Sequence, residues 1–217
     1  MDDLADVGST LDTHVEAARE RLAAVGTESA LPAVQAWRLA YRATGTDPTK
    51  FRMAAESILR RLRTSGDFTR GLHPLVLLCN ALSARYGVPV AALDSERISG
   101  ALQVRTTSDA VRYEAFDGTV STLAAGEVSF VDDAGNAHAR KWSHKQSALS
   151  AVSPATRTAF VVAEALHAEA AVELDQLQRL LAEALGRHWP AAQVHSSRLS
   201  GRDLVTGVGV PGASAIA

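Results

Sequence analysis

The first third of the chain repeats hydrophobic residues at steps of three and four, the spacing of an amphipathic helix. Helices are predicted where a polar cap or a proline opens such a stretch and a glycine closes it. The predicted helices are 11–25, with Ser9 and Thr10 as N-cap candidates, 32–44, 49–63 and 74–86.

From Gly87 onward the pattern changes to short apolar or alternating runs bounded by Gly, Asp and Ser, which is typical of β-strands. The predicted strands are 88–93, 101–106, 111–116, 127–131, 137–142 and 159–162, with a further short strand at 204–210. A helical period then returns at Leu174, Leu177, Leu181 and Leu185, and this helix should end near Gly186. The order of elements predicts an α+β fold with a mixed or mostly antiparallel sheet.

A chain of 217 residues with 47% hydrophobic residues can bury one sizeable core. We expect an N-terminal helical extension at 1–30, one α+β domain at 31–189 and a C-terminal tail at 190–217. The tail is rich in Gly, Ser and Ala and lacks periodicity, so we expect it to be partly mobile.

Charge and cysteine content narrow the class of protein. The net charge of -2 gives no global basic field, so any contact with RNA must be local. The single cysteine, Cys79, excludes an internal disulfide and a cysteine-based zinc cluster, and its place on the apolar face of helix 74–86 predicts a buried structural thiol. The acidic N-terminus and the lack of a long apolar run predict a cytoplasmic protein that does not meet the membrane.

The common catalytic motifs are missing from the sequence. There is no phosphate-binding Gly-x-x-x-x-Gly-Lys, no Gly-x-Gly-x-x-Gly, no Gly-x-Ser-x-Gly and no His-Glu-x-x-His. No two of the seven histidines show the i, i+4 spacing of a helical metal site. We therefore predict neither a metal nor a cofactor.

The densest polar segment, Arg140–Gln146, follows a predicted strand. Its donors and its indole can converge on an anionic or amide-bearing ligand, and His144 titrates near neutral pH as a general base must. The alternative is a strand end that shows its cations to solvent while Trp142 packs. A second basic group could bind RNA phosphate or simply be a solvated helix face, and its members are Arg60, Arg61, Arg63 and Arg70.

The segment 80–100 resembles the opening of the B3/B4 editing domain of the bacterial phenylalanyl-tRNA synthetase β subunit. It has a helical asparagine, Asn80, then a Gly-x-Pro turn, an aspartate, Asp94, and an Ile-x-Gly step in the same order and spacing. The family of small free-standing B3/B4 proteins is more similar still, and the resemblance runs from about 36 to 185. The segments that carry it are 36–42, 45–51, 56–61, 126–128 and 140–147.

The resemblance implies helices that cover a curved mixed sheet around a pocket. In the synthetase this pocket hydrolyses tyrosine wrongly esterified to tRNA, so the resemblance implies a trans-acting aminoacyl-tRNA deacylase. Two alternatives are a non-catalytic module that binds an amino acid or tRNA, and a biosynthetic enzyme that uses aminoacyl-tRNA as a donor. Ala91 and Val162 stand where we align the synthetase's editing histidine and glutamate.

A site relocated to the polar segment follows from this resemblance. It needs a group that activates water and donors that face the ester carbonyl or a phosphate, because an aminoacyl ester is already activated. The candidate catalytic residues are His144, Arg140 and Lys145. The candidate substrate-binding residues are Asn80, Trp142, Gln146, Glu127 and Asp94.

Overall fold

The computed structural model describes residues 6–68, 71–108, 110–199, 208–210 and 213–215. Arg70 lies outside the described residues. So do most of the strand predicted at 204–210 and much of the tail expected to be mobile.

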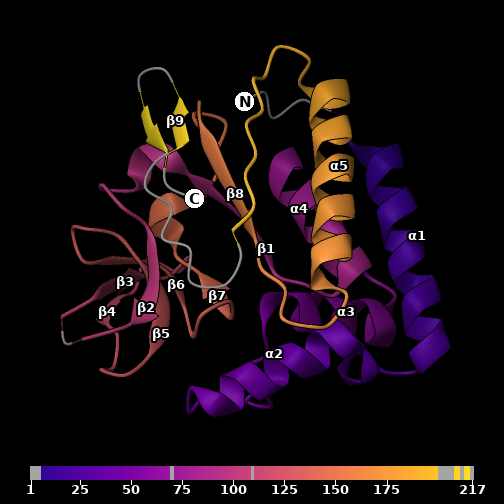
Figure 1. Ribbon diagram of the computed structural model, residues 1–217, viewed down its shortest axis with the longest axis horizontal. Helices are drawn as coiled ribbons and strands as arrows, with labels where there is room; N and C mark the ends of the chain where they lie inside the picture. The colour runs from indigo at the N-terminus through magenta and orange to yellow at the C-terminus, as the bar shows by residue number, and fades with distance from the viewer. Residues whose placement is uncertain (1–5, 69–70, 109, 200–207, 211–212, 216–217) are drawn as a thin grey trace.

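The helices gather on one side of the molecule (Figure 1). They are α1 (Gly8–Val25), α2 (Pro32–Ala43), α3 (Ala54–Ser65), α4 (Pro74–Tyr86) and α5 (Ala170–His188), with short 3-10 turns at Glu28–Ala30, Ser95–Arg97 and Ala148–Ser150. No helix within the described ranges is both long enough and apolar enough to cross a membrane.

Several helix boundaries differ from the prediction. Helix α3 begins five residues late because the Asp47 side chain accepts a hydrogen bond from the Thr49 amide at 2.8 Å and the segment turns before the helix starts. Helix α1 begins at Gly8, so Ser9 lies inside it, and α5 runs past Gly186 to His188.

The strands form a mixed, mostly antiparallel arrangement, which confirms the α+β class. A two-stranded sheet joins β1 (Val90–Asp94) to β8 (Ala159–Ala163). The larger sheet has the order β2-β5-β6-β3-β4, with β7 paired to β6 and only β3 and β6 parallel among these pairs. Its strands are β2 (Gln103–Thr106), β3 (Arg112–Glu114), β4 (Val120–Thr122), β5 (Val128–Val131), β6 (Asn136–Arg140) and β7 (Lys145–Gln146), and a hairpin of β9 (Val208–Val210) and β10 (Ala213–Ala215) follows α5.

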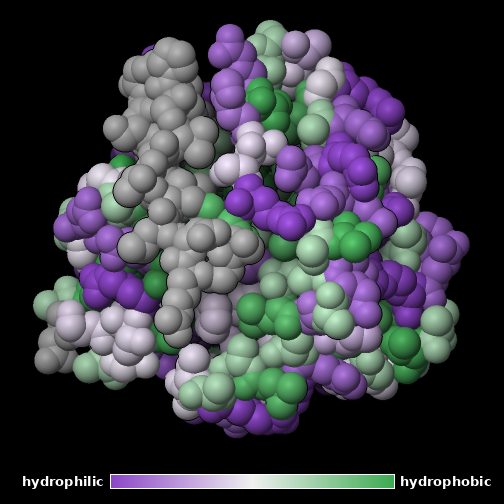
Figure 2. Space-filling view, in the orientation of Figure 1, coloured by the Kyte–Doolittle hydropathy of each residue, from purple (hydrophilic) through white to green (hydrophobic). Residues whose placement is uncertain are grey.

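The main core lies among the helices and the β1–β8 pair. Helix α1 packs against α4 by its apolar face, and a smaller cluster of buried residues lies on the larger sheet. Each fully buried large side chain stabilises the fold by about 1.5–3 kcal/mol. Cys79 is 1% exposed and burial raises its pKa to about 12, which confirms the predicted buried thiol. On the face in Figure 2 the surface apolar residues lie in small separate groups.

The β1–β8 pair lies between the helices and the larger sheet (Figure 1). The Gln146 side chain ties the two sheets together, because its amide donates to the Ala92 carbonyl of β1 at 3.0 Å. An isolated bridge between Leu93 and Ala151 adds a second link. These two links join β1, and with it its partner β8, to the part of the larger sheet that follows the turn between β6 and β7. We call this region the junction of the two sheets.

Candidate functional site

Residues 141–144 form a tight turn between β6 and β7 and do not extend the strand as predicted. Lys141 and Trp142 have φ values of 49° and 60°, in the left-handed region that residues other than glycine seldom adopt. Each such residue costs about 1–2 kcal/mol of backbone energy. The contacts made by this turn must therefore offset a local strain.

Glu127 supplies much of that compensation. Its side chain is nearly buried, and its carboxylate accepts the Lys141 amide at 2.7 Å and pairs with the Lys141 ammonium at 2.8 Å. Arg140 adds an ion pair at 3.4 Å. Glu127, predicted to bind substrate, fixes the backbone of the turn.

The indole of Trp142 joins the turn to β8. Its Nε1 lies 3.2 Å from each carboxylate oxygen of Glu164, and its ring packs edge-to-face on Trp37 with centroids 4.9 Å apart. Trp37 is fully buried, so the second ring gives the first a rigid support.

Glu164 comes directly after β8, and its amide bonds the Pro89 carbonyl. It lies two residues beyond Val162, which pairs with Ala91, so the period of a strand places Glu164 and Val162 on the same side. Burial raises the pKa of Glu164 to about 7, although the hydrogen bond from Trp142 opposes the shift. The strand predicted at 159–162 does not include this carboxylate, although Glu164 is a lone acid within the apolar run 159–166.

The hydroxyls of Ser143 and Tyr41 lie 3.0 Å apart, and the Ala54 amide donates to the Ser143 carbonyl at 2.8 Å. Burial raises the pKa of Tyr41 to about 12, so the phenol stays neutral. Helices α2 and α3 thus hold the turn from its far side.

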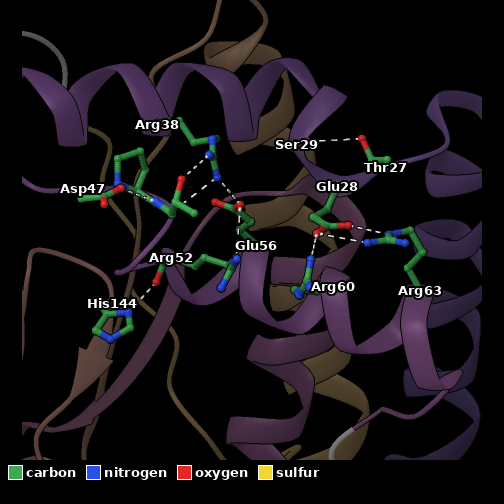
Figure 3. A network of polar contacts seen from close by, with 12 residues as sticks. Thr27, Glu28, Ser29, Arg38, Asp47, Arg52, Glu56, Arg60, Arg63 and His144 are labelled. Carbon is green, nitrogen blue, oxygen red and sulfur yellow. Dashed lines mark hydrogen bonds and ion pairs between the residues drawn. The ribbon is translucent and has the colours of Figure 1, made fainter.

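His144 faces a different partner from Trp142. Its Nδ1 lies 2.6 Å from the Arg52 carbonyl, so the ring takes the tautomer that donates from Nδ1 (Figure 3). It also meets Phe51 edge-to-face at 5.5 Å. Burial lowers the pKa of His144, which favours the neutral imidazole.

The other predicted site residues are spread over the junction. Asp94 accepts the Thr156 hydroxyl at 2.8 Å and caps the turn that follows β1. Asn80 lies half-buried on α4, and its amide makes no hydrogen bond with any described residue. Lys145 is exposed, and Arg140 lies over the Tyr113 ring at 5.4 Å. Within the described ranges no three acidic, histidine or cysteine side chains group as metal ligands do.

Two of the arginines predicted to meet RNA form ion pairs with a buried carboxylate. Arg60 and Arg63 bind the buried Glu28 at 3.4 and 2.6 Å (Figure 3). Burial acts to raise the pKa of Glu28. The hydrogen bond from Arg63 is the largest of the effects that oppose burial, and together they hold this pKa below its usual value. Arg61 is exposed on the same helix.

Among the hollows lined by described residues, two lie on the helical side and include no residue of the turn. The larger, of about 450 Å³, is lined by Ser29, Gln35, Arg38, Leu39 and Arg42. The smaller, of about 260 Å³, is lined by Arg19, Leu22, Ala23, Gly26, Leu62 and Arg63.

The model of the B3/4 domain family matches residues 36–187. The chain belongs to this family. The matched region of this B3/4 domain protein includes Trp37, Trp142 and Glu164, and it confirms the resemblance found in the sequence. A phenylalanine–tRNA ligase beta subunit from Nocardia farcinica (strain IFM 10152) is 36% identical over 105 residues, which is 48% of this chain and 12% of that subunit.

Proposed function

We propose that this B3/4 domain protein hydrolyses, in trans, the ester that links an amino acid to a tRNA. The observation that carries the proposal is the contact between Trp142 and Glu164. It offers a partly buried carboxylate whose pKa lies near neutrality, oriented by an indole donor. A general base works best when its pKa is close to the working pH.

In the proposed reaction, ionised Glu164 accepts a proton from water as the water oxygen forms a bond to the ester carbonyl carbon. The ester C–O bond then breaks, and the carboxylic acid returns the proton to the departing ribose oxygen. The products are a free amino acid and a tRNA with a free terminal hydroxyl. Trp142 acts as a positioning residue, because its N–H holds the carboxylate in place.

The remaining candidates take supporting roles. The Asn80 amide is available to a ligand because no described residue occupies it. His144 stabilises the loop before α3 through its bond to the Arg52 carbonyl, and its other contact is with Phe51. Such a protein would act in the cytoplasm, where aminoacyl-tRNA is made and used, and it would need no metal or cofactor.

A non-catalytic binding module is the second candidate. Two observations favour it. The Trp142 indole already occupies the Glu164 carboxylate, and Ala91, which pairs with Val162, has no imidazole that could activate water. A carboxylate next to an aromatic pair would hold the ammonium group of an amino acid by ionic and cation–π attraction.

A panel of aminoacyl-tRNAs separates the two candidates. The wild type should deacylate at least one species, and Glu164→Gln should reduce that rate by about 10²–10⁴-fold. Glu183→Gln, an exposed carboxylate on α5, is the matched control and should hydrolyse like the wild type. Retention of an amino acid without hydrolysis, lost in Glu164→Gln, would favour the binding module. Transfer of the acyl group to an added amine would instead indicate a biosynthetic enzyme.

A further inference from the structure

Phe51 is surrounded by positive groups in the loop between α2 and α3. The ammonium groups of Lys50 and Lys141 each lie 5.3 Å from the centre of its ring, and His144 meets the ring edge-on. Lys141 comes from the turn that carries Trp142. A flat apolar ring between two lysines is therefore held directly beside the candidate site.

The loop and the turn are fastened to each other at two points. His144 binds the Arg52 carbonyl at 2.6 Å, and the Ala54 amide binds the Ser143 carbonyl at 2.8 Å. Beneath the loop, Arg38 donates to the buried Glu56 at 2.5 Å (Figure 3). The ring and its lysines thus sit on a fixed backbone.

The charge around this ring is positive although the chain carries a net charge of -2. The cations of the loop, the turn and its flanking strand ends are Lys50, Arg52, Arg140, Lys141 and Lys145, and the neighbouring carboxylates are Asp47, Glu56, Glu127 and Glu164. Glu56 and Glu127 are buried and Glu164 is partly buried, so Asp47 is the exposed acid of this set. Lys50 is exposed and forms no ion pair with the described residues.

We propose that Lys50, Phe51 and Lys141 form a platform for the single-stranded 3′ end of an RNA. A base stacks on Phe51, and the exposed ammonium group of Lys50 binds a flanking phosphate, the combination used for single-stranded nucleic acids. Lys141 stays paired with Glu127 at 2.8 Å and lines the platform beside the ring. The platform rests on the proposed function, because the ester to be hydrolysed sits at that end of a tRNA. The platform and the carboxylate of Glu164 are joined through one turn, because Lys141 contacts the Phe51 ring and the next residue, Trp142, contacts Glu164.

The alternative phosphate surface is the outer face of α3. Arg60 and Arg63 already share Glu28, whereas Lys50 keeps its charge for a partner outside the chain. The platform also offers a ring on which a base can stack.

The test uses uncharged RNA, so it does not depend on hydrolysis. Two labelled hairpins are compared by fluorescence anisotropy at fixed salt, one blunt and one with a four-nucleotide single-stranded 3′ end. The wild type should prefer the hairpin with the overhang. Lys50→Glu should weaken that binding by about tenfold or more, and Phe51→Leu, which keeps an apolar side chain, by about 5–100-fold. Arg179→Glu, the same kind of charge reversal on exposed α5, should bind like the wild type.

Three results would overturn the platform. They are equal affinity for both hairpins, unchanged affinity in Lys50→Glu and Phe51→Leu, and no binding by the wild type. A loss confined to Arg61→Glu would move the contact to α3. Deacylation is decided separately, since a protein that binds the overhang through Lys50 yet hydrolyses no ester keeps the platform and loses the proposed catalysis.

Discussion

The indole nitrogen of Trp142 lies 3.2 Å from both carboxylate oxygens of Glu164, and the backbone of Trp142 is in the left-handed region. Glu127 fixes the backbone before the indole, and buried Trp37 supports the ring. Strained backbone persists where its surroundings over-determine it, often at functional sites. The contact between Trp142, in the turn of the larger sheet, and Glu164, at the end of β8, is thus fixed by several neighbouring residues.

The pH dependence of hydrolysis should follow the carboxylate of Glu164. Burial raises its pKa to about 7, and only the ionised form accepts a proton from water. The difference between the hydrolysis rates of the wild type and of Glu164→Gln should therefore rise with pH and level off above about 7. Rates measured from pH 5 to 8.5 test this. An inflection that survives in Glu164→Gln would assign the titration to another group.

Stability should change with pH through the same group. The pKa of Glu164 is raised to about 7 in the folded chain, against about 4.3 for an unfolded glutamate. The folded state thus binds more protons between these values, and this group's contribution to the free energy of unfolding falls as pH rises through that window. Glu164→Gln should match the wild type near pH 4 and exceed it at pH 8 by on the order of 1–3 kcal/mol. Urea unfolding at both pH values measures the difference, and equal stabilities at pH 8 would show that the carboxylate is not desolvated.

The periodic elements could be predicted because their signals are local. Helix α4 matches its prediction because Pro74 and Gly87 mark its two ends, and β5 and β8 follow from short apolar runs. The turn at Asp47 was missed because a side-chain hydrogen bond, and not hydrophobic spacing, delays α3. Strand β4 was missed because all three of its residues are exposed and give no apolar pattern, and β7 was missed because it is only two residues long.

The site was harder to predict, because its contacts join distant segments. The polar segment 140–146 was found from composition, yet the direction of each side chain depends on two left-handed residues that no spacing rule predicts. Trp142 meets Glu164 twenty-two positions away, and Trp37 approaches from a helix near the start of the chain. Such contacts follow from topology, which a single sequence leaves open.

Loss of the Glu127 carboxylate should release the turn. Glu127→Gln removes the ion pair with Lys141 and weakens the bond to the Lys141 amide, so the strained backbone loses its main support. The free energy of unfolding should fall by about 1–3 kcal/mol, and tryptophan fluorescence should shift to the red as the indole of Trp142 becomes wetter. The matched control is Glu114→Gln, whose partner Arg112 is about half exposed, and it should cost less than about 1 kcal/mol. Identical spectra for Glu127→Gln and the wild type would contradict the positioning role.

The Arg38–Glu56 pair should behave as a coupled buried pair. Arg38 lies 2.5 Å from Glu56, whose side chain is 2% exposed and whose second oxygen has no hydrogen-bond partner in the structure. Burial raises the pKa of Glu56 even though the charge of Arg38 opposes the shift. Arg38→Met leaves this carboxylate with only the longer ion pair to Arg52, at 3.9 Å, and should lower the free energy of unfolding by about 3 kcal/mol, and Glu56→Gln should cost less.

A double-mutant cycle measures that coupling. The double variant Arg38→Met with Glu56→Gln should be more stable than the sum of the single changes predicts, because no buried charge remains unpaired. The surface pair of Arg19 and Glu16 is the control, and its coupling should stay below about 0.5 kcal/mol. Strict additivity at Arg38 and Glu56 would show that the carboxylate is already protonated in the folded protein. The loop that carries Phe51 would then depend on its other bonds, among them the one between His144 and the Arg52 carbonyl.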